Sequence, residues 1–118
     1  MTQDNNRCVI TGLGMICAIG NNVEECWDNV LQSKSGLDHT TTVDTENCYA
    51  DYAGEVHDDT LDAFPGAEDL DRASKLSIKA VAEAMADAGL TGFGGNERVS
   101  VIMGSCVGGV VSIEDYYT

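Results

Sequence analysis

The sequence has 118 residues, of which 43% are hydrophobic and 22% are charged, with 13 Gly and a single Pro. This composition excludes a disordered or collagen-like chain and fits one globular domain, residues 1–118, with no room for a second. Six basic and 20 acidic side chains give a net charge of −14. Because that charge repels nucleic acid and anionic membrane surfaces, we expect neither as a partner.

The five cysteines predict neither a disulfide framework nor a metal site, because they are odd in number and contain no CxxC pair. No apolar run reaches the length of a membrane span, and the polar start of the chain does not resemble a secretory signal. We therefore expect a cytoplasmic protein with reduced thiols and no bound metal.

The first elements are predicted from residues 7–36. Residues 7–11 form a short β-branched apolar run, which predicts a strand buried on both faces. A helix is predicted after Asn22, whose side chain can cap it while Glu25 returns the bond. Gly36 is expected to stop this helix. The apolar side chains of the helix recur at helical spacing: Val23, Cys26, Trp27, Val30 and Leu31.

The second half predicts one more helix and one more strand. Residues 37–71 are irregular and acidic, which is typical of a solvated loop, with a short strand at 52–56. A helix rich in small apolar residues begins after Asp71 and ends at Gly89. Residues 98–103 are expected to be a second buried strand. The order strand, helix, helix, strand indicates an α/β fold with a parallel sheet.

The predicted sheet is incomplete. Two or three strands, with a last helix cut after about one turn, would leave apolar edges and a helix face uncovered. We therefore expect the chain to be the opening of a larger fold and to self-associate as a homo-oligomer when isolated.

The glycines after the first strand have part of the pattern of a dinucleotide-binding loop. Gly12, Gly14 and Gly20 follow the strand, but Cys17 stands where the third glycine is needed, and the helix does not begin until Asn22. Phosphates would therefore meet no helix N-terminus. We interpret the segment as a turn at a sheet edge and expect no cofactor.

A second motif, Gly104-Ser105-Cys106-Val107-Gly108, matches the GxCxG spacing of a nucleophile elbow directly after a predicted strand. A thiol nucleophile at Cys106 needs a base, and both histidines, His39 and His57, lie upstream in the irregular segment. The alternative is a small, buried and unreactive thiol. A small thiol hydrolase that uses Cys106 therefore stays open as one function.

Three separated segments share their order and spacing with one enzyme family. They are Arg7-Cys8-Val9-Ile10-Thr11-Gly12-Leu13-Gly14-Met15 with Ile19-Gly20-Asn21, Trp27 and Lys34-Ser35-Gly36-Leu37; then Ala53-Gly54-Glu55-Val56; and finally Asp71-Arg72, Ala86-Asp87-Ala88-Gly89-Leu90, Arg98-Val99, Gly104-Ser105 and Gly108-Gly109. In this succession the chain resembles the beta-ketoacyl-acyl-carrier-protein synthases, elongating condensing enzymes of the thiolase superfamily. The resemblance implies a thiolase-like α/β fold, with this chain as the opening part of its N-terminal half.

The resemblance also implies a function. The family transfers an acyl group from a carrier thioester to a cysteine, then decarboxylates a malonyl thioester beside two histidines. By the resemblance these groups lie beyond Thr118, so no catalytic residue is expected here, the chain alone is expected to be inactive, and Cys106 does not align with the nucleophile. The loop Gly104, Ser105, Cys106, Val107 and Gly108 is expected to border the acyl pocket, with Val107 as its gate.

One feature departs from the family. Its members often carry Lys or Arg before the long helix to receive the acidic acyl carrier protein, and this chain has Glu68 and Asp69 there. Like charges weaken such docking. Basic groups elsewhere or an unusual carrier would explain the difference, in fatty-acid or polyketide-type biosynthesis. A non-catalytic partner subunit of a complete synthase is the second alternative function.

Overall fold

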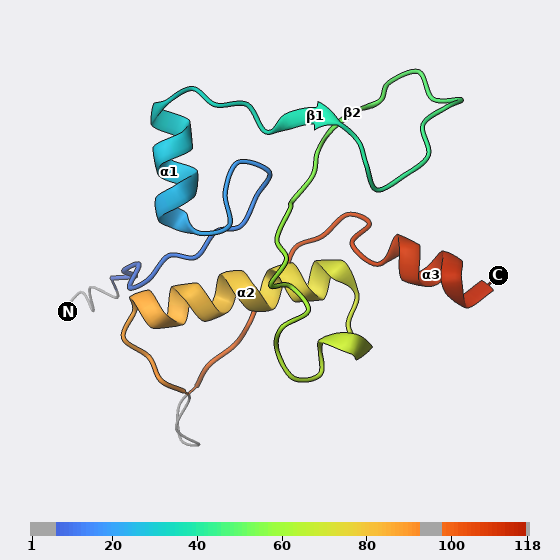
Figure 1. Cartoon of the computed structure of the whole chain (residues 1–118). Helices are drawn as coiled ribbons and strands as arrows, with labels where there is room; N and C mark the ends of the chain where they lie inside the picture. The colour runs from blue at the N-terminus through green and yellow to red at the C-terminus, as the bar shows by residue number, and fades with distance from the viewer. Residues whose placement is uncertain (1–6, 93–97, 118) are drawn as a thin grey trace, which may run out of the picture.

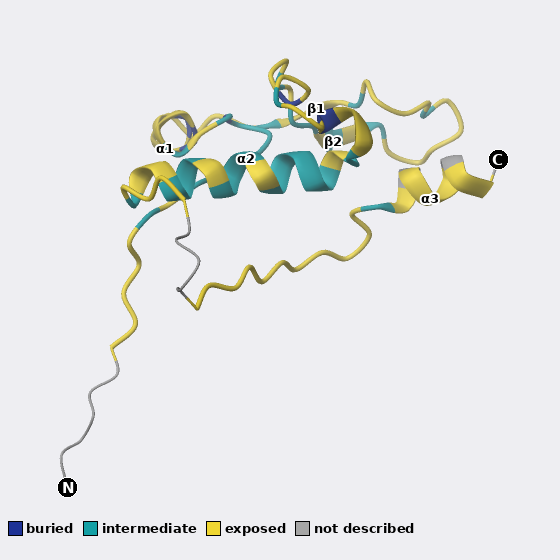
Figure 2. Ribbon diagram, turned by 90° about the horizontal axis from the view of Figure 1, so that it is seen from below, coloured by how far each residue is buried: buried dark blue, intermediate teal, exposed yellow. Residues whose placement is uncertain are grey.

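The computed structural model describes residues 7–92 and 98–117. Helix α2 crosses the middle of the molecule (Figure 1), and the extended segment that leads to α3 lies on the side of α2 opposite to α1 and the strands (Figure 2). The elements in chain order are α1 (Val23–Leu31), β1 (Leu37–His39), β2 (Tyr52–Gly54), the 3-10 turn η1 (Ala67–Asp69), α2 (Arg72–Asp87) and α3 (Val110–Tyr117).

Helix α1 begins where the sequence predicts and ends earlier. The Asn22 side chain accepts a hydrogen bond from the backbone N–H of Glu25 (2.8 Å), which confirms the cap. The Glu25 carboxylate accepts from the N–H of Asn21, not from that of Asn22. The predicted stop at Gly36 is wrong, because the chain already leaves the helix through Ser33, whose φ is 56°.

Helix α2 begins after Asp71 as predicted, and the predicted cap at Gly89 is confirmed. The Asp71 carboxylate accepts from the N–H of Ser74 (2.7 Å) at its start. At its end Gly89 has a φ of 69°, and the N–H of Leu90 donates to the carbonyl of Met85 (2.8 Å). This is a Schellman ending, which glycine favours because it lacks a Cβ.

The predicted parallel sheet is wrong for the described residues. Their one sheet is the antiparallel pair β1 and β2, with Leu37 opposite Gly54. The runs 7–11 and 98–103 form no strand, and Ile102 is 91% exposed. A strand exists only where a neighbour supplies hydrogen-bond partners, and neither run meets one. The α/β class is therefore confirmed only as a mixture of helices and strands.

The apolar surface is largely uncovered, as the sequence predicts. Within the described residues the buried apolar side chains are Cys26, Leu61 and Ala67 (Figure 2). The surface is 10021 Å², whereas a folded chain of 12.5 kDa exposes about 6,200 Å². The radius of gyration is 18.1 Å, against about 13–14 Å for a closed domain of this length. No described helix has both the length and the apolar character to cross a membrane.

The glycine segment packs closely on α2. A Cβ at Gly14 would lie 1.9 Å from the carbonyl oxygen of Ala80, and one at Gly12 would lie 2.1 Å from that of Ala84. The two alanines are four residues apart and lie on one face of the helix. Only glycine at both positions allows this contact, so these glycines serve close packing and not just a turn.

Two carboxylates of α2 hold the same segment. Asp87 accepts from the N–H of Leu13 (2.9 Å), and Glu83 accepts from the N–H of Met15 (2.9 Å). The second oxygen of Glu83 accepts from the N–H of Val23 (2.8 Å), the first residue of α1. The two carboxylates thus accept hydrogen bonds from backbone N–H groups that would otherwise need carbonyl partners on a neighbouring strand.

We predict that Gly14→Ala destabilises the chain and Gly104→Ala does not. The added methyl group at position 14 would collide with backbone, which should lower the free energy of unfolding by about 1–3 kcal/mol. At Gly104 no atom lies within 4 Å of the new Cβ, so the change should stay within about 0.5 kcal/mol. Urea unfolding followed by circular dichroism measures both, and equal midpoints would contradict the close contact.

Candidate functional site

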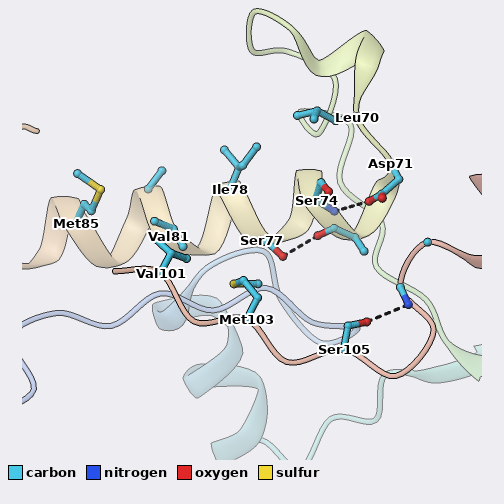
Figure 3. Close-up of a pocket in the computed structure, with 14 residues that line it drawn as sticks. Leu70, Asp71, Ser74, Ser77, Ile78, Val81, Met85, Val101, Met103 and Ser105 are labelled. Carbon is cyan, nitrogen blue, oxygen red and sulfur yellow. Dashed lines mark hydrogen bonds between the residues drawn. The ribbon is translucent and has the colours of Figure 1, made fainter. Parts of the chain in front are cut away.

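A hollow in the described surface lies between α2 and residues 101–109 and measures about 700 Å³. Ile78, Val81 and Met85 come from α2, and Val101 and Met103 come from the extended segment beside it (Figure 3). Both walls are therefore apolar, and the hollow has the size of a small-molecule site.

The polar groups around this hollow are bonded to the chain itself. The Ser77 hydroxyl donates to the carbonyl of Ala73 (2.7 Å), and the Ser105 hydroxyl accepts from the N–H of Gly108 (2.9 Å; Figure 3). At the rim, the N–H of Ser74 keeps the pKa of Asp71 below its usual value. Since these polar groups are already hydrogen-bonded within the chain, an apolar ligand could bind in the hollow without leaving them unsatisfied.

The predicted loop residues divide into two sets. Ser105 and Gly108 line the hollow, whereas Gly104, Cys106 and Val107 do not. A Cβ at Gly108 would lie 2.5 Å from the Ser105 hydroxyl and 3.0 Å from the Cβ of Ala73. A larger residue at position 108, where the loop meets α2, would therefore make the Ser105 side chain turn away. Val107 is 67% exposed in this structure, and its role as a gate stays a prediction.

Comparison with known proteins identifies the family of the chain. The family described as beta-ketoacyl synthase, N-terminal domain, matches residues 5–117. The chain belongs to this family. It is 36% identical to a 3-oxoacyl-[acyl-carrier-protein] synthase 2 of Staphylococcus aureus (strain COL), over 95% of this chain and 28% of that protein. It is 29% identical to the enzyme of the same name from Synechocystis sp., over 98% of this chain and 29% of that protein. The chain thus spans less than a third of these relatives.

Cys106 of this beta-ketoacyl synthase chain is an exposed free thiol, so the prediction that it is buried is wrong. Its backbone is not in the left-handed region, because Ser33 is the one described non-glycine residue with a positive φ. The strained turn that presents the nucleophile of an elbow is therefore not formed at this position.

The two histidines lie together, away from Cys106. His39 and His57 line a separate cavity of about 140 Å³, and Cys106 lines neither cavity. The His39 Nδ1 lies 2.7 Å from the Asp51 carboxylate, and the His57 Nε2 lies 3.9 Å from that of Glu55. No histidine lines the apolar hollow that Ser105 and Gly108 border. Among the described residues, neither histidine is therefore placed to act as a base for Cys106.

Glu55 anchors the wall of this second cavity. Its carboxylate accepts hydrogen bonds from the hydroxyl groups of Thr40, Thr41 and Thr42 and from two of their backbone N–H groups. The hydroxyl of Thr40, with those of its two neighbours, holds the pKa of Glu55 far below its usual value. The predicted strand 52–56 thus ends at Gly54, and Glu55 fastens the following turn to the threonine run.

Ion pairs hold the acidic loop on α2, and no pattern in the sequence indicates them. Lys79 pairs with Asp58, whose side chain is only 4% exposed, and Lys75 pairs with Asp62, which is 78% exposed. Burial alone would raise the pKa of Asp58, but Lys79 and Thr60 outweigh it and lower this pKa from 3.8 to about 2. The prediction of a solvated loop is therefore wrong at Asp58.

We predict that Lys79→Met lowers the free energy of unfolding at pH 7 and also weakens the dependence of that free energy on pH between about 4 and 2. Because the pKa of Asp58 is depressed, its contribution is complete above about pH 4 and is lost as the pH falls toward 2. Without Lys79 the buried carboxylate has no cation, which should cost about 1–3 kcal/mol at pH 7 and remove much of that pH dependence.

The matched control is Lys75→Met, which breaks the exposed pair with Asp62 and should cost about 0–1 kcal/mol. Urea unfolding at several pH values between 2 and 7 compares the two variants with the parent. Equal losses in both variants would show that burial of Asp58 does not matter.

Proposed function

We propose that this chain is the N-terminal scaffold and acyl-pocket segment of a 3-oxoacyl-[acyl-carrier-protein] synthase. The complete enzyme would condense an acyl thioester with malonyl-acyl carrier protein in fatty-acid or polyketide-type biosynthesis. The observation that carries the proposal is the apolar hollow between α2 and residues 101–109, in a chain that matches this family along residues 5–117. The names of the two relatives agree with this chemistry.

An alkyl chain fits the character of this hollow. Ile78, Val81, Met85, Val101 and Met103 present hydrocarbon on both sides, and each methylene group that is buried there gains about 0.8 kcal/mol. The thioester chemistry itself is assigned to groups outside the residues described. In this proposal the loop Gly104–Gly108 sets how far the acyl chain can enter, and its residues act by shape and not by reaction.

Acyl carrier protein is the proposed partner of the complete enzyme. Glu68 and Asp69 are exposed beside the start of α2, where they repel an acidic carrier. The carrier is therefore expected to dock on basic groups of another part of the enzyme. We also place the enzyme in the cytoplasm, which suits its free thiols, and as a homo-oligomer, which would cover apolar surface.

A chimera tests the function. This chain replaces the matching 28% of the Staphylococcus aureus relative, and condensation of acyl and malonyl thioesters is followed by mass spectrometry. We expect the chimera to form the 3-oxoacyl product and the 118-residue chain alone to form none. Condensation by the chain alone would contradict the proposal, and thioester hydrolysis that is lost in Cys106→Ser would contradict it and favour the hydrolase.

Substitutions of Val107 in the same chimera test the acyl gate. Val107→Phe should shift the products toward shorter chains and Val107→Ala toward longer ones, because a methylene group that loses its place forfeits about 0.8 kcal/mol, or about fourfold in preference. Val43→Phe is the matched control, since Val43 is about as exposed as Val107 and lies outside the loop of residues 104–108. An unchanged distribution of chain lengths in both Val107 variants would remove this residue from the gate.

A further inference from the structure

Two cysteines that the proposed function does not use lie side by side. The Sγ atoms of Cys17 and Cys26 are 3.4 Å apart, although the two residues are nine positions apart in the sequence. The other three cysteines, Cys8, Cys48 and Cys106, are exposed. A disulfide bond has a length of about 2.05 Å, so a shift of about 1.4 Å would join the two sulfur atoms.

A tight turn and a glycine create this arrangement. The N–H of Cys17 donates to the carbonyl of Gly20 (2.9 Å), and the N–H of Gly20 donates back to that of Cys17 (3.1 Å). Gly20 has no side chain, and the Cys26 thiol occupies the space beside it, since a Cβ at Gly20 would lie 2.9 Å from that sulfur. The Cys26 thiol therefore lies beside Gly20 and next to Cys17, the residue that pairs with Gly20 in an isolated β-bridge.

The turn and the helix are fastened to each other. The Asn29 side chain donates to the carbonyl of Ile19, and the N–H of Asn21 donates to the carboxylate of Glu25 (2.8 Å). Cys26 is 1% exposed and Asn29 is buried as well. The two thiols therefore face each other from elements that cannot separate without breaking these bonds.

We propose that Cys17 and Cys26 are a redox-modification site, in which hydrogen peroxide converts the two thiols into a reversible disulfide. This inference is independent of the condensation chemistry proposed above. It assigns a use to the one pair of sulfur atoms that the described structure places in contact.

The two cysteines have different parts in the reaction. Cys17 lines a cavity of about 120 Å³ together with Lys34 and His57, which is large enough for a peroxide molecule. Cys26 is shielded from solvent, and this burial, together with the contact with Cys17, raises the pKa of its thiol to about 11. Cys17 is thus the thiol that meets the oxidant, and Cys26 resolves the product.

The steps balance as follows. The Cys17 sulfur, as thiolate, attacks one peroxide oxygen, the O–O bond breaks, and the departing hydroxide takes up a proton to form water. The Cys26 sulfur then attacks the sulfenic sulfur of Cys17, the S–O bond breaks, and the Cys26 proton leaves with the hydroxide as a second water. Two thiols lose two electrons and two protons in total, and one peroxide is reduced.

Mass spectrometry of the full chain tests the pair. The chain is treated with hydrogen peroxide, alkylated, and cleaved after Glu24 and Glu25, which lie between the two cysteines. We expect a disulfide-linked pair of peptides that a reductant separates, formed about tenfold faster than in the chain unfolded in urea, where the thiols are no longer held together. The link should persist in Cys8→Ser and in Cys106→Ser and be lost in Cys17→Ser.

The variant Cys26→Ser separates the two roles. Cys17 should then accumulate as a sulfenic acid that dimedone traps, whereas in Cys17→Ser the thiol of Cys26 should stay unmodified. Links that form mainly among Cys8, Cys48 and Cys106, or equal rates in native buffer and in urea, would overturn the proposal. Because these readouts follow sulfur and not condensation, they leave the proposed synthase function unaffected.

Discussion

The structure depends on the close approach of the Gly12–Met15 segment to α2. Glycines at 12 and 14 let backbone meet backbone at Ala80 and Ala84, and the carboxylates of Glu83 and Asp87 take the amide protons of that segment. Glu83 also reaches the first turn of α1. One face of α2 thus organises the N-terminal part of the chain, which leaves its other face to form a wall of the apolar hollow.

This division explains how a chain with few buried residues presents an ordered surface. Polar bonds at its edges position α2: Asp71 caps one end, the Gly89 turn ends the other, and Lys79 holds the acidic loop. Most of the large apolar side chains therefore remain exposed on the surface and are not buried in a core. The matched relatives are more than three times longer than this chain, and an exposed apolar face of this extent is typical of a surface that makes contacts with other molecules.

Local features could be predicted from the sequence, and long-range ones could not. The caps at Asn22 and Gly89 depend on neighbours within a few residues, and both predictions are confirmed. The predicted start of a helix after Asp71 is confirmed as well. The strands at 7–11 and 98–103 were predicted from hydrophobicity, but a strand needs a partner that the run itself does not encode. Likewise the pair of Lys79 with Asp58 and the contact of Cys17 with Cys26 arise from tertiary packing, so neither spacing indicates them. Of the loop, Ser105 and Gly108 line the hollow, and its role at an acyl pocket stays a prediction.

The uncovered apolar surface coexists with a net charge of −14, and the two act over different ranges. Electrostatic repulsion between copies extends over about 10 Å at 0.1 M salt and shrinks to about 3 Å at 1 M, whereas hydrophobic contact needs direct touch. Ionic strength therefore governs the association of the chain with itself. In dilute buffer, charge repulsion keeps the copies apart, and at high salt their exposed apolar surfaces can come into contact.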